Sequence, residues 1–164
     1  MKLFGIAGWS GSGKTSLIEA LLPLFTRAGL KISLIKHTHH GFDLDRPGKD
    51  SFRFRAAGAA EVMLAGAERW ALMHEAYEEK SPGLATLSAR LSPCDLVLVE
   101  GFKAAELPKI EVYRASLGKP FFHPECINVV AIASDETHAV DLPLLDLNDP
   151  PAIADYILRF NGLA

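Results

Sequence analysis

The chain has 164 residues, a formal net charge of −3 and 49% hydrophobic residues. This length favours one domain, residues 1–164, with a substantial core of its own, and the charge gives no general attraction to nucleic acid or to an anionic membrane surface. No apolar run approaches the ~18 residues of a membrane span, and the first residues run directly into a strand pattern, so we expect no secretory signal. Cys94 and Cys126 belong to no C-x-x-C pair, which favours buried free thiols in a reducing cytoplasm.

Residues 8–15 read G-W-S-G-S-G-K-T and match the P-loop pattern G-x-x-x-x-G-K-[S/T] completely. The apolar run before them, residues 2–7, predicts a buried strand, and apolar positions at helical spacing over 16–28 predict a helix. Strand, glycine loop and helix thus occur in the order that phosphate binding requires. Because Pro23 falls inside the helical pattern, we expect a kink or a break there.

The P-loop residue types explain the chemistry expected of them. Glycines let backbone N–H groups converge on phosphate oxygens, and the helix directs its positive end at the same anion. Lys14 can reach the β- and γ-phosphates and is a candidate catalytic residue, while the hydroxyl of Thr15 can ligate Mg²⁺. The predicted nucleotide-binding set in this segment is Gly8, Ser10, Gly11, Ser12, Gly13, Lys14, Thr15 and Ser16.

Residues 30–35 alternate as a second strand should, and the strand–helix–strand order predicts that it pairs in parallel with the first strand. The polar segment 36–50 follows it as a long loop. Ligands of open α/β sheets bind at the carboxyl ends of the strands, so we expect Lys36 and His37, which leave this strand, to contact the nucleotide.

The rest of the chain continues the alternation of strands and helices. A short helix capped by Asp50-Ser51 should run to Ala57, and an antiparallel hairpin should join two strands around Gly66. The predicted ranges are 61–65 and 69–73 for the hairpin, 83–91 for a helix, 95–101, 109–113, 127–135 and 144–147 for strands, and a last helix capped by Asn148 or Asp149. This pattern predicts a three-layer α/β P-loop fold, with a mainly parallel sheet and an antiparallel hairpin extension.

The strand over 95–101 is an apolar run that ends in Glu100 and Gly101. A carboxylate at the end of a buried strand is what a Walker B element places beside the phosphates to hold Mg²⁺ or its water. We therefore interpret Glu100 as a metal-binding and catalytic candidate. The alternative is an ordinary strand end in contact with solvent.

Two clusters in the 36–50 loop allow more than one interpretation. His37, His39 and His40 could form a metal site, or they could donate hydrogen bonds to anions. The carboxylates of Asp43, Asp45 and Asp50 could be surface charges. Alternatively, one of them, for which we select Asp45, could join Thr15 and Glu100 around Mg²⁺. The cations beside them that could pair with phosphate are Lys36, Arg46 and Lys49. Arg53 and Arg55 do not share a helix face, so we expect one to face solvent and the other the loop.

Asp135 ends the predicted strand over 127–135. A carboxylate there can accept from the paired N–H donors of guanine, a contact that adenine cannot reproduce. The usual N-K-x-D signature is absent, since residues 132–135 read I-A-S-D. Asp135 is therefore either a guanine-binding residue or a solvated strand end.

In three segments the chain closely resembles the MobB family of molybdopterin-guanine dinucleotide biosynthesis adaptors. These segments are the P-loop, the loop over 36–51 with K-H-T-H-H, F-D-L-D and P-G-K-D-S, and V-E-G-F-K over 99–103. The resemblance runs from the first strand to about Asp135. It implies a dimeric, Mg²⁺-dependent GTP-binding protein with weak GTPase activity, which assists the nucleotidyltransferase MobA in attaching GMP to the molybdenum cofactor. It also implies guanine as the base, in line with the interpretation of Asp135.

Two function classes remain open from the sequence. One is a GTP-binding adaptor that hydrolyses GTP slowly, and the other is a small-molecule kinase that uses the same phosphate cradle. A kinase normally closes an arginine-bearing lid over the phosphates, and no second arginine-rich segment is evident, which favours the adaptor. The apolar hairpin over 61–75 also predicts a homodimer, since an exposed apolar edge is a hazard unless a second copy covers it.

Overall fold

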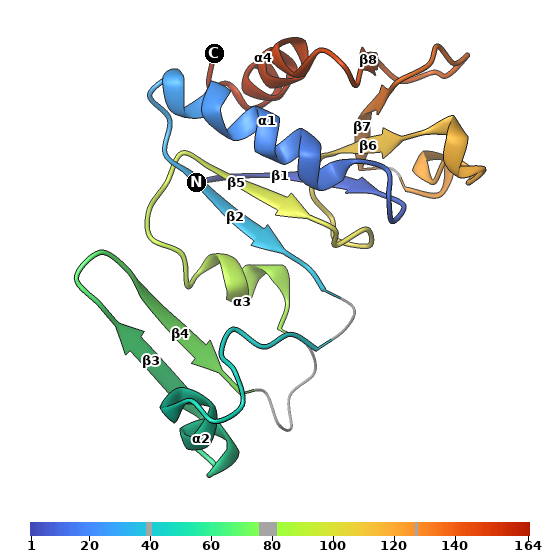
Figure 1. The fold of residues 1–164 in the computed structure, drawn as a ribbon. Coiled ribbons are helices and arrows are strands. Elements are labelled where there is room, and N and C mark those ends of the chain that lie inside the picture. The colour runs from blue at the N-terminus through green and yellow to red at the C-terminus, as the bar shows by residue number, and fades with distance from the viewer. Residues whose placement is uncertain (39–40, 76–81, 127) are drawn as a thin grey trace. The chain divides into compact units, whose positions relative to one another are not determined.

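The computed structural model describes residues 1–38, 41–75, 82–126 and 128–164, which form two compact units (Figure 1). The first unit comprises residues 1–37 and 87–164, and the second comprises residues 38–86. Within the described ranges, no helix has both the length and the apolar character to cross a membrane. That all 164 residues form a single nucleotide-binding domain stays a prediction.

A six-stranded sheet forms the centre of the first unit, and every neighbouring pair in it is parallel. The strand order is β2-β5-β1-β6-β7-β8. The strands are β1 (Lys2–Gly8), β2 (Ile32–Lys36), β5 (Leu96–Glu100), β6 (Lys109–Tyr113), β7 (Val129–Ser134) and β8 (Leu144–Asp146). Because all six are parallel, their carboxyl ends meet at one edge of the sheet.

The predicted pairing of the second strand with the first is wrong, because β5 lies between them. Leu96 of β5 pairs with Lys2 on one side and with Ile32 on the other. All five residues of β5 are buried, whereas β2 has one buried residue. A continuous apolar run is favoured at the centre of a parallel sheet, so β5 takes the inner position and β2 the edge.

Two helices cover one face of this sheet, α1 (Lys14–Arg27) and α4 (Pro150–Asn161), and Figure 1 shows both on the same side of it. The core between helices and sheet contains Phe4, Ile6, Leu17, Ile18, Leu21, Phe25, Leu96, Leu98, Ile110, Val112, Ile153 and Ile157. Burial of each such side chain contributes roughly 1.5–3 kcal/mol. Helix α1 continues through Pro23 without a break, so this packing holds the helix together where its backbone is weakened.

The last helix begins where its sequence signals place it. Asp149 is the N-cap, and its carboxylate accepts a hydrogen bond of 3.1 Å from the N–H of Ala152. Pro150 and Pro151 occupy the first turn, where a missing N–H costs nothing. Of the two predicted caps, Asp149 is therefore the correct one.

The second unit contains α2 (Asp50–Ala56) and the antiparallel pair β3 (Glu61–Ala65) and β4 (Trp70–His74). The pair is a two-stranded sheet of its own. Helix α2 begins after Lys49, which makes no side-chain cap, so the predicted cap at Asp50-Ser51 is wrong. Helix α3 (Leu84–Ser88) is shorter than predicted and contains the boundary between the residue ranges of the two units. Two short 3-10 helices, η1 (Ala115–Leu117) and η2 (His123–Glu125), belong to the first unit. The predicted class, a mainly parallel α/β fold with an antiparallel hairpin, is confirmed.

Candidate functional site

The P-loop connects the carboxyl end of β1 to the start of α1, in the first unit. Gly11 and Gly13 have φ angles of +82° and +98°, which only glycine adopts readily. A side chain at Gly8 would collide with the Val112 carbonyl and the Ser12 hydroxyl. The tight loop therefore depends on the glycines of the motif.

Lys14 folds back across the loop that precedes it. Its Nζ donates to the carbonyl oxygens of Gly8 at 3.1 Å and of Trp9 at 2.8 Å. Burial lowers the pKa of Lys14, Glu100 opposes this effect, and the nearby cations Lys103 and Lys36 add to it. A phosphate group would supply the negative charge that favours the ammonium form, so the lysine is suited to an anionic ligand.

Three predicted site residues converge at the mouth of the P-loop. Thr15 Oγ1 donates to Glu100 Oε1 at 3.2 Å, and Lys36 Nζ lies 3.2 Å from Glu100 Oε2. Lys36 Nζ also donates to Thr15 Oγ1 at 3.4 Å. Glu100 is 7% exposed, so it is not a strand end in open solvent. A hydroxyl beside a buried carboxylate is a donor set that fits Mg²⁺, which prefers oxygen ligands.

The turn after β5 passes beside the end of β2. The backbone N–H of His37 donates to the carbonyl of Glu100 at 2.9 Å, and the His37 ring lies 4.5 Å from that of Phe102. Phe102 has a φ of +47°, uncommon outside glycine. The ammonium group of Lys103 lies 3.8 Å from the centre of the Trp9 ring, a cation–π contact. His37 therefore lies beside the backbone of Glu100, and its predicted contact with the nucleotide stays a prediction.

Arg114 is a site residue that the sequence reasoning missed. Its Nη1 lies 2.6 Å from Asp135 Oδ2, and its Nε donates to the carbonyl of Ser12 in the P-loop at 3.1 Å. Tyr113 and Ser134 are paired across β6 and β7, so the residues that follow them are neighbours. The available signal was a cation directly after a predicted strand, at the edge where the P-loop lies.

A polar cavity of about 310 Å³ lies beside Asp135, at the carboxyl ends of β7 and β8. Its lining includes Asp135, Asp146 and Asn148. Asp135 Oδ1 is buried and has no hydrogen-bond partner among the described residues. This cavity is on the same edge of the sheet as the P-loop, because β1, β7 and β8 run in the same direction.

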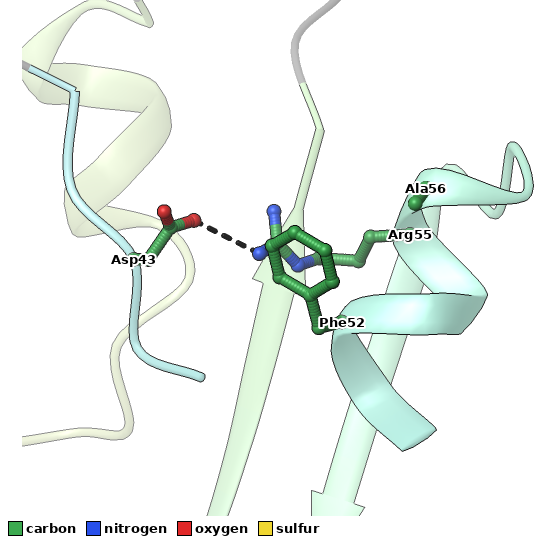
Figure 2. A pocket seen from close by; sticks show the side chains of 4 residues that line it. All are labelled: Asp43, Phe52, Arg55 and Ala56. Carbon is green, nitrogen blue, oxygen red and sulfur yellow. Dashed lines mark hydrogen bonds and ion pairs between the residues drawn. The ribbon is translucent and has the colours of Figure 1, made fainter. Parts of the chain in front are cut away.

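The second unit holds the predicted loop carboxylates around Arg55. The guanidinium of Arg55 pairs with Asp45 at 2.6 Å, Glu75 at 2.6 Å and Asp43 at 2.9 Å. Figure 2 shows Asp43 facing Arg55, with Phe52 beside it around a small cavity. The hydrogen bond from Arg55 is the main cause that lowers the pKa of Asp45.

The prediction that one of the two arginines faces solvent and the other the loop is confirmed. Arg53 is exposed and pairs with Asp50 at 3.7 Å, whereas Arg55 bonds to the loop carboxylates. The role of Asp45 as a Mg²⁺ ligand stays a prediction. His39 and His40 lie outside the described residues, and the described part of the chain contains no group of three histidine, cysteine or carboxylate side chains able to hold a metal. Cys94 and Cys126 are free thiols, but both are partly exposed, so the prediction that they are buried is wrong.

Comparison with known proteins places this site in a family. The family model for MobB, "Molybdopterin guanine dinucleotide synthesis protein B", matches residues 3–135. The chain belongs to the MobB family. The matched residues include every predicted nucleotide- and metal-binding residue of this family member, from Gly8 to Asp135, and the resemblance drawn from the sequence motifs is confirmed.

Relatives of this MobB family member match it over nearly its whole length. A molybdopterin-guanine dinucleotide biosynthesis adapter protein of Escherichia coli is 43% identical, over 96% of this chain and 92% of the relative. One of Haemophilus influenzae is 44% identical, over 94% and 86%. Among solved structures, Bacillus subtilis MobB is 28% identical and superposes with a TM-score of 0.76 over 97% of each chain. The relatives therefore share the fold of both units and not the P-loop alone.

Proposed function

We propose that this chain is a GTP-binding adapter in the synthesis of molybdopterin guanine dinucleotide. The observation that carries the proposal is the convergence of Thr15, Glu100 and Lys36 at the mouth of a complete P-loop. The names of the relatives support the adapter role. The reaction that the adapter assists is the attachment of GMP to the molybdenum cofactor, and the proposed partner is the nucleotidyltransferase MobA.

The phosphate groups would bind to the amides of the P-loop and to Lys14. Thr15 and Glu100 would hold Mg²⁺, which neutralises charge on the β- and γ-phosphates when bound. Lys36 now neutralises Glu100, so it would share that carboxylate with the metal or turn to the phosphates. Asp45 belongs to the second unit, where Arg55 bonds to both of its carboxylate oxygens, so its assignment as a metal ligand stays a prediction.

We propose guanine as the base that this site selects. The cavity at the ends of β7 and β8 has the polar lining that a base edge requires. Asp135 is part of this lining, and its Oδ1 has no hydrogen-bond partner among the described residues. Because Oδ2 is already bonded to Arg114, Oδ1 is the oxygen that would accept from a guanine N–H. Guanine is also the base in the product for which the relatives are named.

GTP turnover by the protein alone should be slow, well below ~1 s⁻¹ against a median enzyme near ~10 s⁻¹. Fast hydrolysis needs a group that orients the attacking water and a cation that neutralises charge on the transferring phosphoryl group. Where an arginine finger supplies this cation, it raises kcat by a factor of ~10³–10⁵. Phe102 and Lys103 follow Gly101 in place of a glutamine, and Lys103 is held over Trp9.

Phosphate release from Mg²⁺-GTP, measured with and without MobA, tests this prediction. A parallel incubation with small-molecule acceptors tests the kinase alternative, which predicts a phosphorylated product. Turnover near the median enzyme rate without any partner would contradict the adapter proposal.

The hairpin should form part of a homodimer contact. Register places Met63, Trp70 and Leu72 on one face of the β3–β4 pair, with exposed fractions of 60%, 64% and 36%. The opposite face carries Val62 and Met73, which are buried. This apolar face, and outer strand edges that pair with no other strand in the described part of the chain, are well suited to a two-fold contact with a second copy.

Sedimentation at micromolar concentration should therefore show a dimer, and Trp70→Glu should shift the protein to monomer. Phe160→Glu, at an exposed aromatic residue of α4, is the matched control and should leave the dimer intact. A monomeric wild-type protein would refute this part of the proposal.

A further inference from the structure

Arg114 connects two segments that are far apart in the sequence and adjacent at the site. It follows β6 and reaches the P-loop on one side and the end of β7 on the other. Its Nε donates to Ser12 O and its Nη1 to Asp135 Oδ2. A guanidinium group suits this double contact because its donors are held in a fixed plane.

The contact with Ser12 O fixes one peptide plane of the P-loop. In a trans peptide the carbonyl and the following N–H point in opposite directions. Holding the Ser12 carbonyl toward Arg114 therefore turns the N–H of Gly13 away from it. Since Gly13 directly precedes Lys14 at the start of α1, this N–H is one of those that a P-loop offers to phosphate.

The fit between Arg114 and the loop is close. A Cβ at Gly13 would come within 3.4 Å of both Nε and Nη2 of Arg114, so the guanidinium lies directly against that glycine. Ser12 is 1% exposed, and a buried carbonyl left without a donor would cost free energy. The arginine thus satisfies the loop's backbone in one particular conformation.

Asp135 holds the other end of the guanidinium. The side chains of Arg114 and Asp135 are 35% and 24% exposed, so the ion pair is partly shielded from solvent. The pair keeps Arg114 in place and balances its charge where a triphosphate would otherwise attract it. Ordering a free arginine side chain on Ser12 O would cost conformational entropy. Because Asp135 already holds the guanidinium, the ion pair with Asp135 offsets part of this cost.

We propose that Arg114 is a positioning residue, which fixes the P-loop in its phosphate-binding conformation, and that Asp135 anchors it. This inference rests on the proposed function, nucleotide binding at the P-loop, and adds to it a residue outside the motif. Arg114 acts through the backbone of Ser12 and Gly13, so its effect falls on the phosphates.

Calorimetric titration with Mg²⁺-GTP and Mg²⁺-ATP tests the proposal. Loss of a hydrogen bond from a charged group predicts that Arg114→Ala weakens both nucleotides by roughly tenfold or more. ATP, whose base makes no guanine contact with Asp135, reports the loss at the phosphates alone. Arg114→Lys, which can reach one of the two acceptors, should recover part of the loss. Arg159→Ala, which breaks the exposed Arg159–Asp155 pair of α4, is the matched control and should bind as the wild type does.

The anchor role is tested with ATP, whose base cannot use a guanine contact. Asp135→Asn should weaken ATP binding, and in combination with Arg114→Ala it should add no further loss, because the two residues act as one unit. Asp135→Asn alone and Arg114→Lys carry the test if Arg114→Ala does not fold. A wild-type protein that binds no nucleotide would overturn the proposed function and this inference with it. A wild type that binds GTP and an Arg114→Ala variant that binds equally well would overturn only the positioning role.

Discussion

Lys14→Ala should lower the affinity for Mg²⁺-GTP by more than tenfold while the fold stays intact. Truncating one partner of a close charged contact commonly costs ~2–5 kcal/mol, and Lys14 is the cation that the P-loop motif assigns to the β- and γ-phosphates. Its side chain is partly buried at the N-terminus of α1, and among the described residues its hydrogen bonds go to backbone carbonyls of the loop. The expected loss is therefore chiefly one of ligand binding.

Calorimetry of the variant beside Lys31→Ala checks this result. Lys31 is exposed and precedes β2, so it lies at the opposite edge of the parallel sheet from the P-loop and its removal should leave the affinity unchanged. Equal affinity of Lys14→Ala and wild type would refute the assignment of the phosphate site.

Glu100→Gln should abolish most of the gain in GTP affinity that Mg²⁺ provides. The amide keeps an oxygen for the Thr15 hydroxyl but removes the negative charge that a hard divalent cation requires. Without Mg²⁺ the affinity should be unchanged or higher, because a carboxylate beside the phosphates has been removed. The substitution also breaks the Glu100–Lys36 ion pair. Breaking a buried ion pair lowers the stability of a protein by roughly 3–5 kcal/mol. Because Lys36 is half exposed, we expect the loss of stability here to be at or below the lower end of this range.

The measurement is a pair of GTP titrations, one with Mg²⁺ and one with a chelator. Glu106→Gln, at an exposed glutamate of the same unit, controls for the change in net charge. A Glu100→Gln variant that retains the full effect of Mg²⁺ would remove Glu100 from the metal site.

The sequence was most informative where one local signal determines one local structure. The P-loop pattern, the apolar run that delivers Glu100 and the cap at Asp149 each depend on a few neighbouring residues, and each appears as predicted. The proximity of Glu100 and Thr15 could be predicted because Glu100 ends one strand and the P-loop, which contains Thr15, follows another, so both lie at the carboxyl ends of strands.

The features that were missed depend on which strands become neighbours. The insertion of β5 between β1 and β2 follows from competition for the centre of the sheet, which no single segment encodes. Arg114 meets Ser12 only because β6 lies beside β1. Asp135 was correctly placed at the end of a strand, but its partner Arg114 could not be identified without the pairing of β6 with β7.

Direct titration of the wild-type protein with Mg²⁺-GTP and Mg²⁺-ATP tests the central claim, that the P-loop of this MobB family member binds a guanine nucleotide. The sequence contains one P-loop pattern, so we expect one GTP bound per chain. Because we propose that the site selects guanine, we expect a weaker affinity for ATP. Absence of binding, or equal affinity for GTP and ATP, would contradict it.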